Sequence, residues 1–307
     1  MRLLRIIILL AFLTGLPISG IGAESTGHSE EGLPAHAVGI WTLHLPVIGD
    51  FPITNSMIVS WIVALGLIAF AQIATRNMKA VPTGAQNFLE WLVESLSEFL
   101  EGIIGRELVK RTFWFFATVF IFILFSNWVG LIPGFGTIGY GTSTGKGFLA
   151  LEHVDQPWLR GVNADLNMTL AMSLTFFACW IIWALQSNGP VGFLLHLFAP
   201  RGETTGIMKA LMIVIFLVVG CLEVVSILFR PVSLSFRLFG NIYAGENILE
   251  AMSGLMPGWI GRVLIPVPFY FMELLVGVVQ ALVYMLLTAV FTLLICQHDE
   301  DHAKEHH

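Results

Sequence analysis

The sequence predicts an all-α integral membrane protein of about five membrane helices, one amphipathic surface helix and a C-terminal hairpin of two long, strongly tilted helices. Three observations support this fold class. Hydrophobic residues make up 56% of the 307 residues, and charged residues make up only 12%, about half of their share in a soluble domain. The mean hydropathy is +0.82. Apolar runs long enough to cross a bilayer recur along the chain, and loops with proline and glycine separate them.

The N-terminal segment 1–23 has the pattern of a cleaved secretory signal peptide. Arg2 and Arg5 precede an apolar segment over 6–18, and small residues follow it. This order of charged, apolar and small residues is typical of a signal that is removed after export. An uncleaved first membrane helix is the alternative. After cleavage, residues 24–50 would form a polar tail on the outer side of the membrane.

The predicted membrane domain covers residues 51–297, and each of its spans needs about 20 apolar residues to cross about 30 Å of hydrocarbon. Adjacent proline and glycine residues at positions 133–134, 189–190 and 257–258 indicate turns between the spans. The runs that are long enough are 54–75, 112–133 and 167–187, followed by two longer apolar stretches over 207–256 and 258–297.

The two longer stretches predict a helix hairpin over 207–297. One helix over 207–254 would be about 72 Å long at about 1.5 Å per residue, more than twice the hydrocarbon thickness of about 30 Å. It must therefore tilt strongly, break, or cross the membrane twice. Two crossings would place Arg262 on the inner side and Lys304 on the outer side, which fits the distribution of positive charge less well. We favour one long tilted helix, followed by a second one from 258 to 297.

Positive charges predict the orientation of the chain, because basic residues collect on the cytoplasmic side of membrane proteins. With five spans and the N-terminus outside, eight basic residues lie inside and three lie outside. The C-terminus and its charged tail over 298–307 then lie in the cytoplasm, as in a bacterial inner-membrane protein. The inner residues are Arg76, Lys79, Arg106, Lys110, Arg111, Arg201, Lys209 and Lys304, and the outer ones are Lys146, Arg160 and Arg262.

Residues 83–104 differ from the spans, since acidic side chains recur at helical spacing among apolar ones. This pattern predicts an amphipathic helix that lies on the membrane surface or against a partner. Its polar stripe consists of Glu90, Glu94, Glu98 and Glu101, so attraction to anionic lipids does not explain it. We expect this helix to dock on a neighbouring subunit, and a solvated face is the alternative.

The sequence lacks the patterns of most other functions. It has no basic cluster for nucleic-acid binding, no phosphate-binding glycine loop and no Ser-His-Asp set. Neither a cofactor nor a metal site is expected, because the terminal histidines lie in the charged tail. The three cysteines occur in apolar runs without the spacing of metal ligands, and they are interpreted as small buried hydrophobic residues. They are Cys179, Cys221 and Cys296.

An arginine in the middle of the long stretch is the strongest functional signal. Arg237 would lie within the membrane, where an arginine costs at least about 2.5–3.5 kcal/mol and indicates a functional site by default. No acidic residue occurs within eight positions on either side of it. Its counter-charge must come from elsewhere in the fold or from another subunit, and a structural arginine is the alternative. Arg230, just before Pro231, is interpreted as reaching toward water.

Acidic residues occur on both sides of Arg237. Glu223 precedes it by 14 residues, nearly on the same helix face and about 21 Å along the axis. Glu246 follows it by nine residues, on the opposite face and about 13.5 Å along the axis. Asn241, at i+4, shares the face of Arg237, and Glu250 is a further acid in this stretch. The pattern indicates two partial polar routes with a fixed positive charge between them.

The last helix carries a polar stripe. Glu273, Gln280 and Tyr284 are spaced i, i+7 and i+11, so all three point in one direction. Such a stripe on an apolar helix lines a water-filled path or meets another polar stripe. Hydrogen bonding between helices alone is the alternative for Gln280 and Tyr284.

The residues around Arg237 closely resemble the signature of ATP synthase subunit a, the membrane stator subunit of the rotary Fo sector. They read Pro-Val-Ser-Leu-Ser-Phe-Arg-Leu-Phe-Gly-Asn-Ile-Tyr-Ala-Gly-Glu over 231–246. The resemblance covers roughly residues 50–297. Further matches are Asn127 followed by Leu-Ile-Pro over 131–133, the segment Asn-Ala-Asp-Leu-Asn-Met-Thr over 163–169, and Gln280.

The resemblance implies a channel subunit that makes no covalent bond. It implies that Arg237 faces the rotor ring of subunit c, meets each ring carboxylate as it passes, favours release of the ion and blocks a leak between two half-channels. It also implies contact with the peripheral-stalk subunit b. By the same resemblance, Glu223 lies near the inner half-channel, while the outer half-channel contains Asn241, Glu246, Glu273 and Gln280, with Asp165 and Asn167 near its entrance.

One position departs from the family that the chain resembles. Many bacterial relatives have histidine on the last helix where this chain has Glu273. The two acids Glu246 and Glu273 are therefore expected to titrate as one coupled unit. The transported ion is expected to be a proton, with sodium as the alternative. A self-contained secondary transporter is a second hypothesis, but the sequence shows no internal repeat of the kind typical of such proteins.

Overall fold

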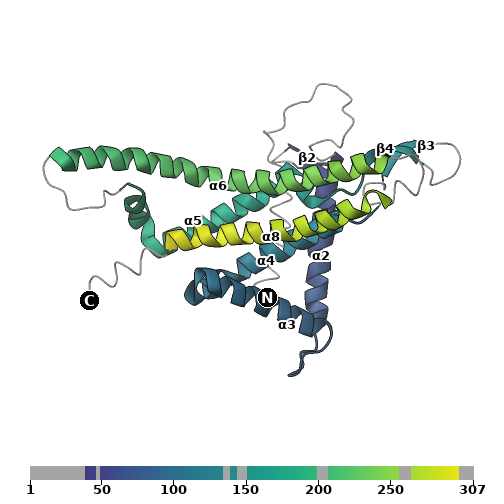
Figure 1. Ribbon diagram of the computed structural model, residues 1–307, viewed down its shortest axis with the longest axis horizontal. Coiled ribbons are helices and arrows are strands. Elements are labelled where there is room, and N and C mark those ends of the chain that lie inside the picture. The colour runs from purple at the N-terminus through teal and green to yellow at the C-terminus, as the bar shows by residue number, and fades with distance from the viewer. Residues whose placement is uncertain are drawn as a thin grey trace.

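The chain is a multi-pass membrane protein of the predicted all-α class (Figure 1). Within the described residues, five helices are long and apolar enough to cross a membrane. The predicted signal peptide over 1–23 and the charged tail over 298–307 lie outside the described residues. The computed structural model describes residues 39–45, 49–133, 139–143, 151–198, 207–255 and 264–296.

Six α-helices and one 3-10 turn form most of this described part. Each helix corresponds to a segment that the hydrophobic pattern predicts, although several bounds differ. The helices are α2 (Asn55–Thr75), α3 (Ala85–Ile104), α4 (Arg106–Gly130), α5 (Leu166–Phe198), α6 (Ile207–Gly254) and α8 (Val267–Cys296), and the 3-10 turn is η2 (Val162–Ala164).

Two antiparallel β-hairpins are absent from the sequence-based prediction. β1 (Gly39–Leu45) pairs with β2 (Gly49–Thr54), and β3 (Gly139–Ser143) pairs with β4 (Leu151–Pro157). The hydrophobic pattern indicates only a polar tail and a loop at these places. Pairing between two short segments of mixed composition creates the hairpins, and a search for long apolar runs does not detect it.

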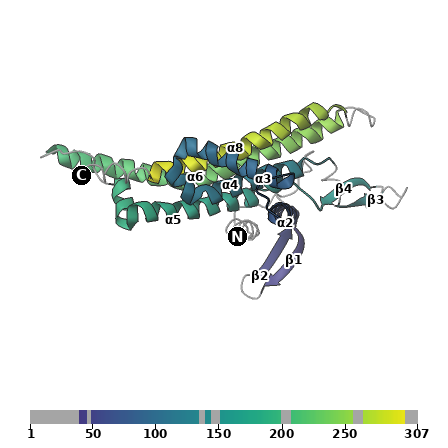
Figure 2. The same cartoon turned by 90° about the horizontal axis from the view of Figure 1, so that it is seen from below.

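Helix α2 has a different direction from the rest of the bundle. Figure 1 shows it running crosswise to α6 and α8, and Figure 2 shows it end-on. Thr54 caps its N-terminus, since the Thr54 hydroxyl accepts a hydrogen bond from the backbone N–H of Met57 at 3.4 Å. The buried Ser56 hydroxyl donates to Asp165 Oδ2 at 2.6 Å. This bond fastens the start of α2 to the residues that precede α5.

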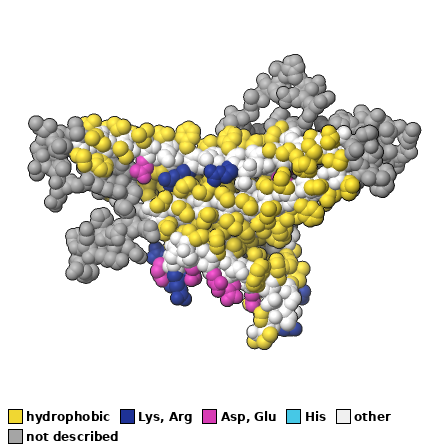
Figure 3. Space-filling view, viewed as in Figure 1, with side chains coloured by type: hydrophobic (Ala, Val, Ile, Leu, Met, Phe, Trp, Pro, Cys, Tyr) yellow, Lys and Arg dark blue, Asp and Glu magenta, His cyan; other side chains and the backbone are white. Residues whose placement is uncertain are grey.

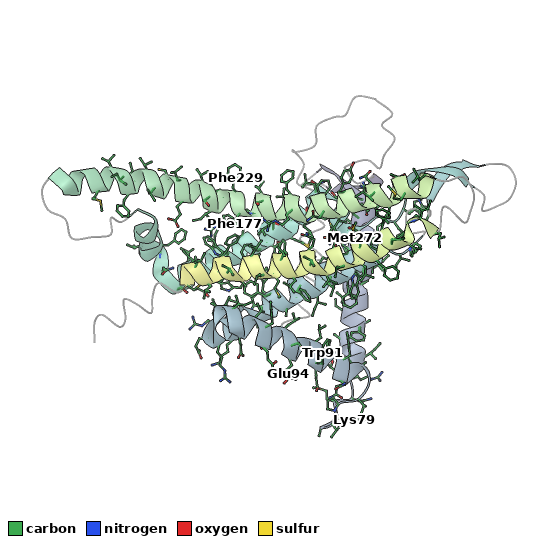
Figure 4. All side chains as sticks on the ribbon, in the orientation of Figure 1. Lys79, Trp91, Glu94, Phe177, Phe229 and Met272 are labelled. Carbon is green, nitrogen blue, oxygen red and sulfur yellow. The ribbon has the colours of Figure 1, made fainter. Side chains whose placement is uncertain are left out.

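Helix α3 is the predicted amphipathic helix. Leu96, Leu100 and Ile104 are buried at helical spacing, and α3 packs against α4 and α2. Acidic side chains lie on its outer edge, where Figure 4 labels Glu94. Gly105 separates α3 from α4, because its φ of 79° is readily adopted only by glycine and turns the chain within one residue.

Helix α4 begins at Arg106, earlier than the predicted start of its span at 112. The helix begins before the predicted span because its first two turns are charged, while the apolar run that marks the span begins only after Arg111. Further along, α4 forms the centre of the core. Phe115 and Ile123 are almost completely buried, and α4 packs along α8.

Helix α5 consists of two helical segments that meet at Gly189. The backbone of Gly189 has φ 69° and ψ 167°, and Pro190 follows it. This break confirms the turn predicted at 189–190, since glycine tolerates a positive φ and proline lacks the N–H that a continuing helix would use. The indole N–H of Trp180 donates to the backbone oxygen of Phe291 at 3.0 Å. The first segment of α5 is thereby fixed against α8.

Helices α6 and α8 form the predicted long hairpin. Helix α6 is one continuous helix of 48 residues that contains Pro231, and α8 has 30 residues. Figures 1 and 2 show the two helices side by side along the longest dimension of the molecule. At about 1.5 Å per residue α6 is about 72 Å long, so it cannot stand upright in a bilayer. The described start of α8 at Val267 lies later than the predicted start at 258.

The cysteines are less buried than predicted. Cys221 is exposed, and Cys179 and Cys296 are partly exposed. Cys221 lies on α6, the least buried of the candidate membrane helices, since only 17% of its apolar window is buried within the described structure. An apolar side chain on that face contacts lipid or another subunit instead of the core.

Helices α4 and α8 approach closely at Gly277. A Cβ atom added at this buried glycine would lie 3.1 Å from Asn127 Cβ. The missing side chain lets Asn127 Nδ2 donate to the backbone oxygen of Gly277 at 3.1 Å. Small residues commonly allow such close contacts between membrane helices.

We expect Gly277→Val to destabilise the protein by about 1–3 kcal/mol, because the added side chain overpacks the contact between α4 and α8. A lower midpoint of thermal unfolding of the purified protein in detergent would report this loss. Gly66→Val is the matched control, since no atom lies within 4 Å of a Cβ added at Gly66 on α2. An equal decrease in both variants would contradict the assignment of Gly277 as a packing contact.

Candidate functional site

Arg237 lies on an exposed face of α6. Its side chain is exposed, and among the described residues no carboxylate forms an ion pair with it. Figure 3 shows basic side chains along α6 within a surface that is otherwise largely hydrophobic. An arginine in hydrocarbon needs a counter-charge or an aqueous path. The described part of the chain does not supply this counter-charge.

Exposed apolar side chains occur along α6, on both sides of Arg237 in sequence, and on α8, and we call this surface the hairpin face. Figure 4 labels Phe229 on α6 and Met272 on α8, and both side chains are exposed. Exposed apolar side chains on two adjacent membrane helices indicate contact with lipid or with another membrane subunit. Further exposed members of the hairpin face are Val225, Leu228, Phe236, Phe271 and Leu275.

Glu246 and Glu273 lie on the side of the hairpin that faces the bundle. The Glu246 side chain is 15% exposed, and Glu273 is 4% exposed. The helical spacing predicts that Glu246 and Arg237 occupy opposite faces of one helix, and their different exposure agrees with this. Both carboxylates line a small cleft between α4, α6 and α8, which we call the acidic cleft.

Two glycines make room for these carboxylates. A Cβ atom added at Gly161 would collide with Glu246 Oε1, and one added at Gly245 would collide with the carboxylate of Glu273. Gly245 directly precedes Glu246 on α6. The side chain of Glu273 from α8 therefore rests against the backbone of α6 next to Glu246, and the two acids interact electrostatically.

Arg160 contributes a positive charge to the acidic cleft. It is 7% exposed, and its Nε lies 3.6 Å from Glu246 Oε2. It belongs to the loop between β4 and η2, far from α6 in sequence. The ion pair therefore depends on the packing of this loop against α6.

Buried amides line the same cleft. Asn163 Nδ2 donates to Asn127 Oδ1 at 2.6 Å, and Asn127 donates in turn to Gly277. Glu246 Oε2 and Glu273 Oε1 are buried without a hydrogen-bond partner among the described residues. Buried polar atoms normally find a hydrogen-bond partner. These two oxygens are therefore suited to accept a proton or to bind water in the cleft.

The remaining polar residues of the hairpin have different positions. Asn241 is exposed, as Arg237 is, in agreement with their spacing of i and i+4. On α8, Gln280 is half-buried and Tyr284 is buried. The Tyr284 hydroxyl donates to Ser173 Oγ of α5 at 3.3 Å. Tyr284 thus forms a hydrogen bond between helices, as in the alternative to a water-filled path that the sequence left open for this residue.

The two residues predicted at the outer entrance differ in the exposure of their side chains. Asp165 is 2% exposed, and it accepts hydrogen bonds from the Ser56 hydroxyl at 2.6 Å and from the backbone N–H of Asn167 at 3.0 Å. It therefore connects α2 to the start of α5. The Asn167 side chain is exposed.

Glu223 is half-buried on α6, on the other side of Arg237 from Glu246. Arg230, two turns further along, interacts with Glu223 electrostatically. The guanidinium carbon of Arg230 lies 4.6 Å from the ring centroid of Phe291 and 5.6 Å from that of Trp180. Cation–π contacts thus hold the half-buried Arg230 against α5 and α8, and whether it also reaches toward water stays a prediction.

Arg160 is the residue of the cleft that the sequence pattern misses. The charge count assigns it only to the outer loops, because a loop has no regular spacing from which the direction of a side chain could be predicted. Among the described residues, no group of three His, Cys, Asp or Glu side chains could hold a metal ion. The cleft is thus defined by carboxylates, amides and one guanidinium.

Comparison with known proteins identifies one family for most of the chain. A family model described as ATP synthase A chain matches residues 57–292. The chain is 32% identical to ATP synthase subunit a of Gloeobacter violaceus over 252 residues, which cover 82% of this chain and 86% of the relative. It is also 32% identical to ATP synthase subunit a of Aeromonas salmonicida over 267 residues, which cover 86% of this chain and 90% of the relative.

A third relative, ATP synthase subunit a of Solidesulfovibrio magneticus, is 30% identical over 257 residues, which cover 84% of this chain and 90% of the relative. The family match covers most or all of each of the five candidate membrane helices and includes the segment around Arg237. From its sequence matches and its helices, the chain belongs to the ATP synthase subunit a family, the ion-translocating stator subunits of the membrane-embedded Fo sector.

Proposed function

We propose that this subunit passes protons between two half-channels and the carboxylates of a rotor ring of subunit c, with Arg237 as the gate between the half-channels. The observation that carries the proposal is the exposed guanidinium of Arg237 within the apolar hairpin face. It has no anionic partner among the described residues. A passing ring carboxylate supplies that partner, and the ring covers the hairpin face.

The cost of burying charge explains why an arginine is needed. An ionised ring carboxylate cannot turn into lipid, because burying an unpaired charge is strongly unfavourable. Opposite Arg237, a ring carboxylate is tolerated in its ionised form. A ring carboxylate that arrives protonated can therefore release its proton there. The guanidinium stays protonated at any physiological pH, and its fixed charge blocks a direct leak between the half-channels.

The outer half-channel includes the acidic cleft. Glu246 and Glu273 receive protons there, since both carboxylates line the cleft. Protons then reach the ring past Asn241, which is exposed on α6, and Gln280, which is half-buried on α8. Asp165 and Asn167 form the outer entrance in this proposal.

The inner half-channel passes Glu223. This residue lies on the same helix as the gate, toward the start of α6, and is half-buried near Arg230. A ring carboxylate that has been neutralised on the outer side turns through the lipid for nearly a full rotation. It then releases its proton toward Glu223 before it meets Arg237.

The orientation follows from the charge distribution. We place the N-terminus outside and the C-terminus in the cytoplasm of a bacterial inner membrane, because this arrangement puts most basic loop residues inside. The peripheral-stalk subunit b docks on α3, whose acidic residues Glu94 and Glu98 are exposed. The segment 1–23 is removed as a signal peptide.

Arg237→Lys tests the gate, because lysine keeps the positive charge but loses the delocalised fork of the guanidinium. In vesicles that contain the whole complex, we expect the rate of ATP-driven proton pumping to fall at least about tenfold. This decrease corresponds to an activation free energy that is about 1.4 kcal/mol higher. Assembly should be preserved, since the side chain is exposed. Arg237→Ala should also lose pumping and should permit passive proton leak.

Arg76→Lys is the matched control, because Arg76 is an exposed arginine at the end of α2. Normal pumping by Arg237→Ala would sink the proposed function. Pumping by the wild type that depends on added sodium would identify sodium, and not the proton, as the transported ion.

Replacement of the two cleft acids should reveal one coupled unit. We expect Glu246→Gln and Glu273→Gln each to reduce proton pumping, and the double variant to lose less than the product of the two single effects, because neighbouring groups are not additive. Glu107→Gln is the control, since Glu107 forms only an exposed pair with Lys110. Strictly independent effects would show that the two carboxylates act separately.

The N-terminus offers a direct test of the proposed signal peptide. N-terminal sequencing of the subunit purified from its native membrane should find a chain that begins near Glu24, since the small residues of a cleavage site precede this position. Recovery of a chain that still begins with the segment 1–23 would support the uncleaved membrane helix instead.

A further inference from the structure

Arg160 is buried although it belongs to a loop. Its residue exposure is 7%, and arginine is almost never so buried unless it is paired. Its Nε lies 3.6 Å from Glu246 Oε2. Of the eleven basic residues that the charge count assigns to the inner and outer loops, Arg160 has the only ion pair with a carboxylate of α6 or α8 among the described residues.

The surroundings of Glu246 contain more negative than positive charge. Arg160 faces it from the loop before η2, Glu273 faces it from α8, and Glu250 lies one turn further along α6. The other polar groups of the cleft, Asn127 and Asn163, are neutral. Arg160 is therefore the single cation that compensates the acids of the cleft within the described residues.

We propose that Arg160 is a positioning residue of the outer half-channel, which holds Glu246 ionised in the cleft near Glu273 so that the two acids share one transferable proton. This inference rests on the proposed function and assigns a role that the resemblance does not assign. Gly161, directly after Arg160, lets the Glu246 carboxylate approach the loop backbone. Loop and carboxylate thus fit together at this point.

Charge balance gives the physical reason. Two carboxylates in a buried cleft without a cation would both favour the neutral acid, because an unpaired buried charge costs several kcal/mol. A pair of neutral acids has no vacant site for an arriving proton. With Arg160 beside it, Glu246 can be ionised while Glu273 holds the proton. One proton can then enter from outside as another leaves toward the ring.

The outer pH is the variable that tests this role. We expect the rate of ATP synthesis by vesicles that contain the whole complex to depend on the pH on the side of the outer half-channel. A potassium diffusion potential is adjusted at each pH so that the total driving force stays constant. In Arg160→Gln the profile should move to higher pH by about one to three units, the range by which an opposite charge within 4–6 Å favours ionisation. Arg76→Gln, an exposed arginine, should leave it unchanged.

A second comparison covers the case in which Arg160→Gln does not assemble. Loss of the arginine leaves Glu246 as an unpaired buried acid. The double variant, which combines Arg160→Gln with Glu246→Gln, removes both charges. The amount of assembled complex should then recover to at least the level of Glu246→Gln alone. A wild-type pH profile in an assembled Arg160→Gln complex would overturn the proposal, and so would a double variant that assembles no better than Arg160→Gln.

The Arg237→Lys variant, measured in the same vesicles, separates this inference from the proposed function. Normal ATP synthesis by Arg237→Lys would contradict the proposal that the gate needs the guanidinium of Arg237, whatever the behaviour of Arg160→Gln. Loss of synthesis in Arg237→Lys, together with an unshifted profile in Arg160→Gln, would leave the gate in place. Only the role of Arg160 would then be rejected.

Discussion

A charged side chain at the centre of a bilayer costs at least about 2.5–3.5 kcal/mol, and α6 and α8 carry several such groups. Two of them have identified partners within the described residues. Glu246 pairs with Arg160, and Arg230 lies over aromatic rings. Arg237 is exposed on the hairpin face, and no carboxylate of the described residues forms an ion pair with it. This contrast distinguishes Arg237 from Glu246 and Arg230.

Close packing at glycine makes the acidic cleft possible. Gly277 brings α8 against Asn127, while Gly161 and Gly245 leave space for the two carboxylates. Polar groups from α4, α6, α8 and the loop before η2 therefore meet in one small volume. Interactions between such groups are strong because little water surrounds them. Glu246, which lines the cleft, and the exposed Arg237 lie on opposite faces of α6.

The fold could be predicted well wherever long apolar runs determine it. The spans, the amphipathic helix α3 and the single long helix α6 follow from length and periodicity, because a membrane admits few other backbone structures. The start of α4 and the two β-hairpins could not be predicted in this way. The first turns of α4 are charged, and the hairpins depend on pairing between short segments. Neither feature leaves an apolar pattern in the sequence.

The sequence by itself determined the membrane class, the family and the opposite faces of Arg237 and Glu246, because helical periodicity fixes the direction of side chains within one helix. Only the tertiary structure decided which side chains from different elements meet. It brought Arg160 to Glu246 and placed Arg230 against the aromatic rings of α5 and α8. The physical reason is that contacts between distant segments depend on how helices and loops pack, and no local spacing records that packing.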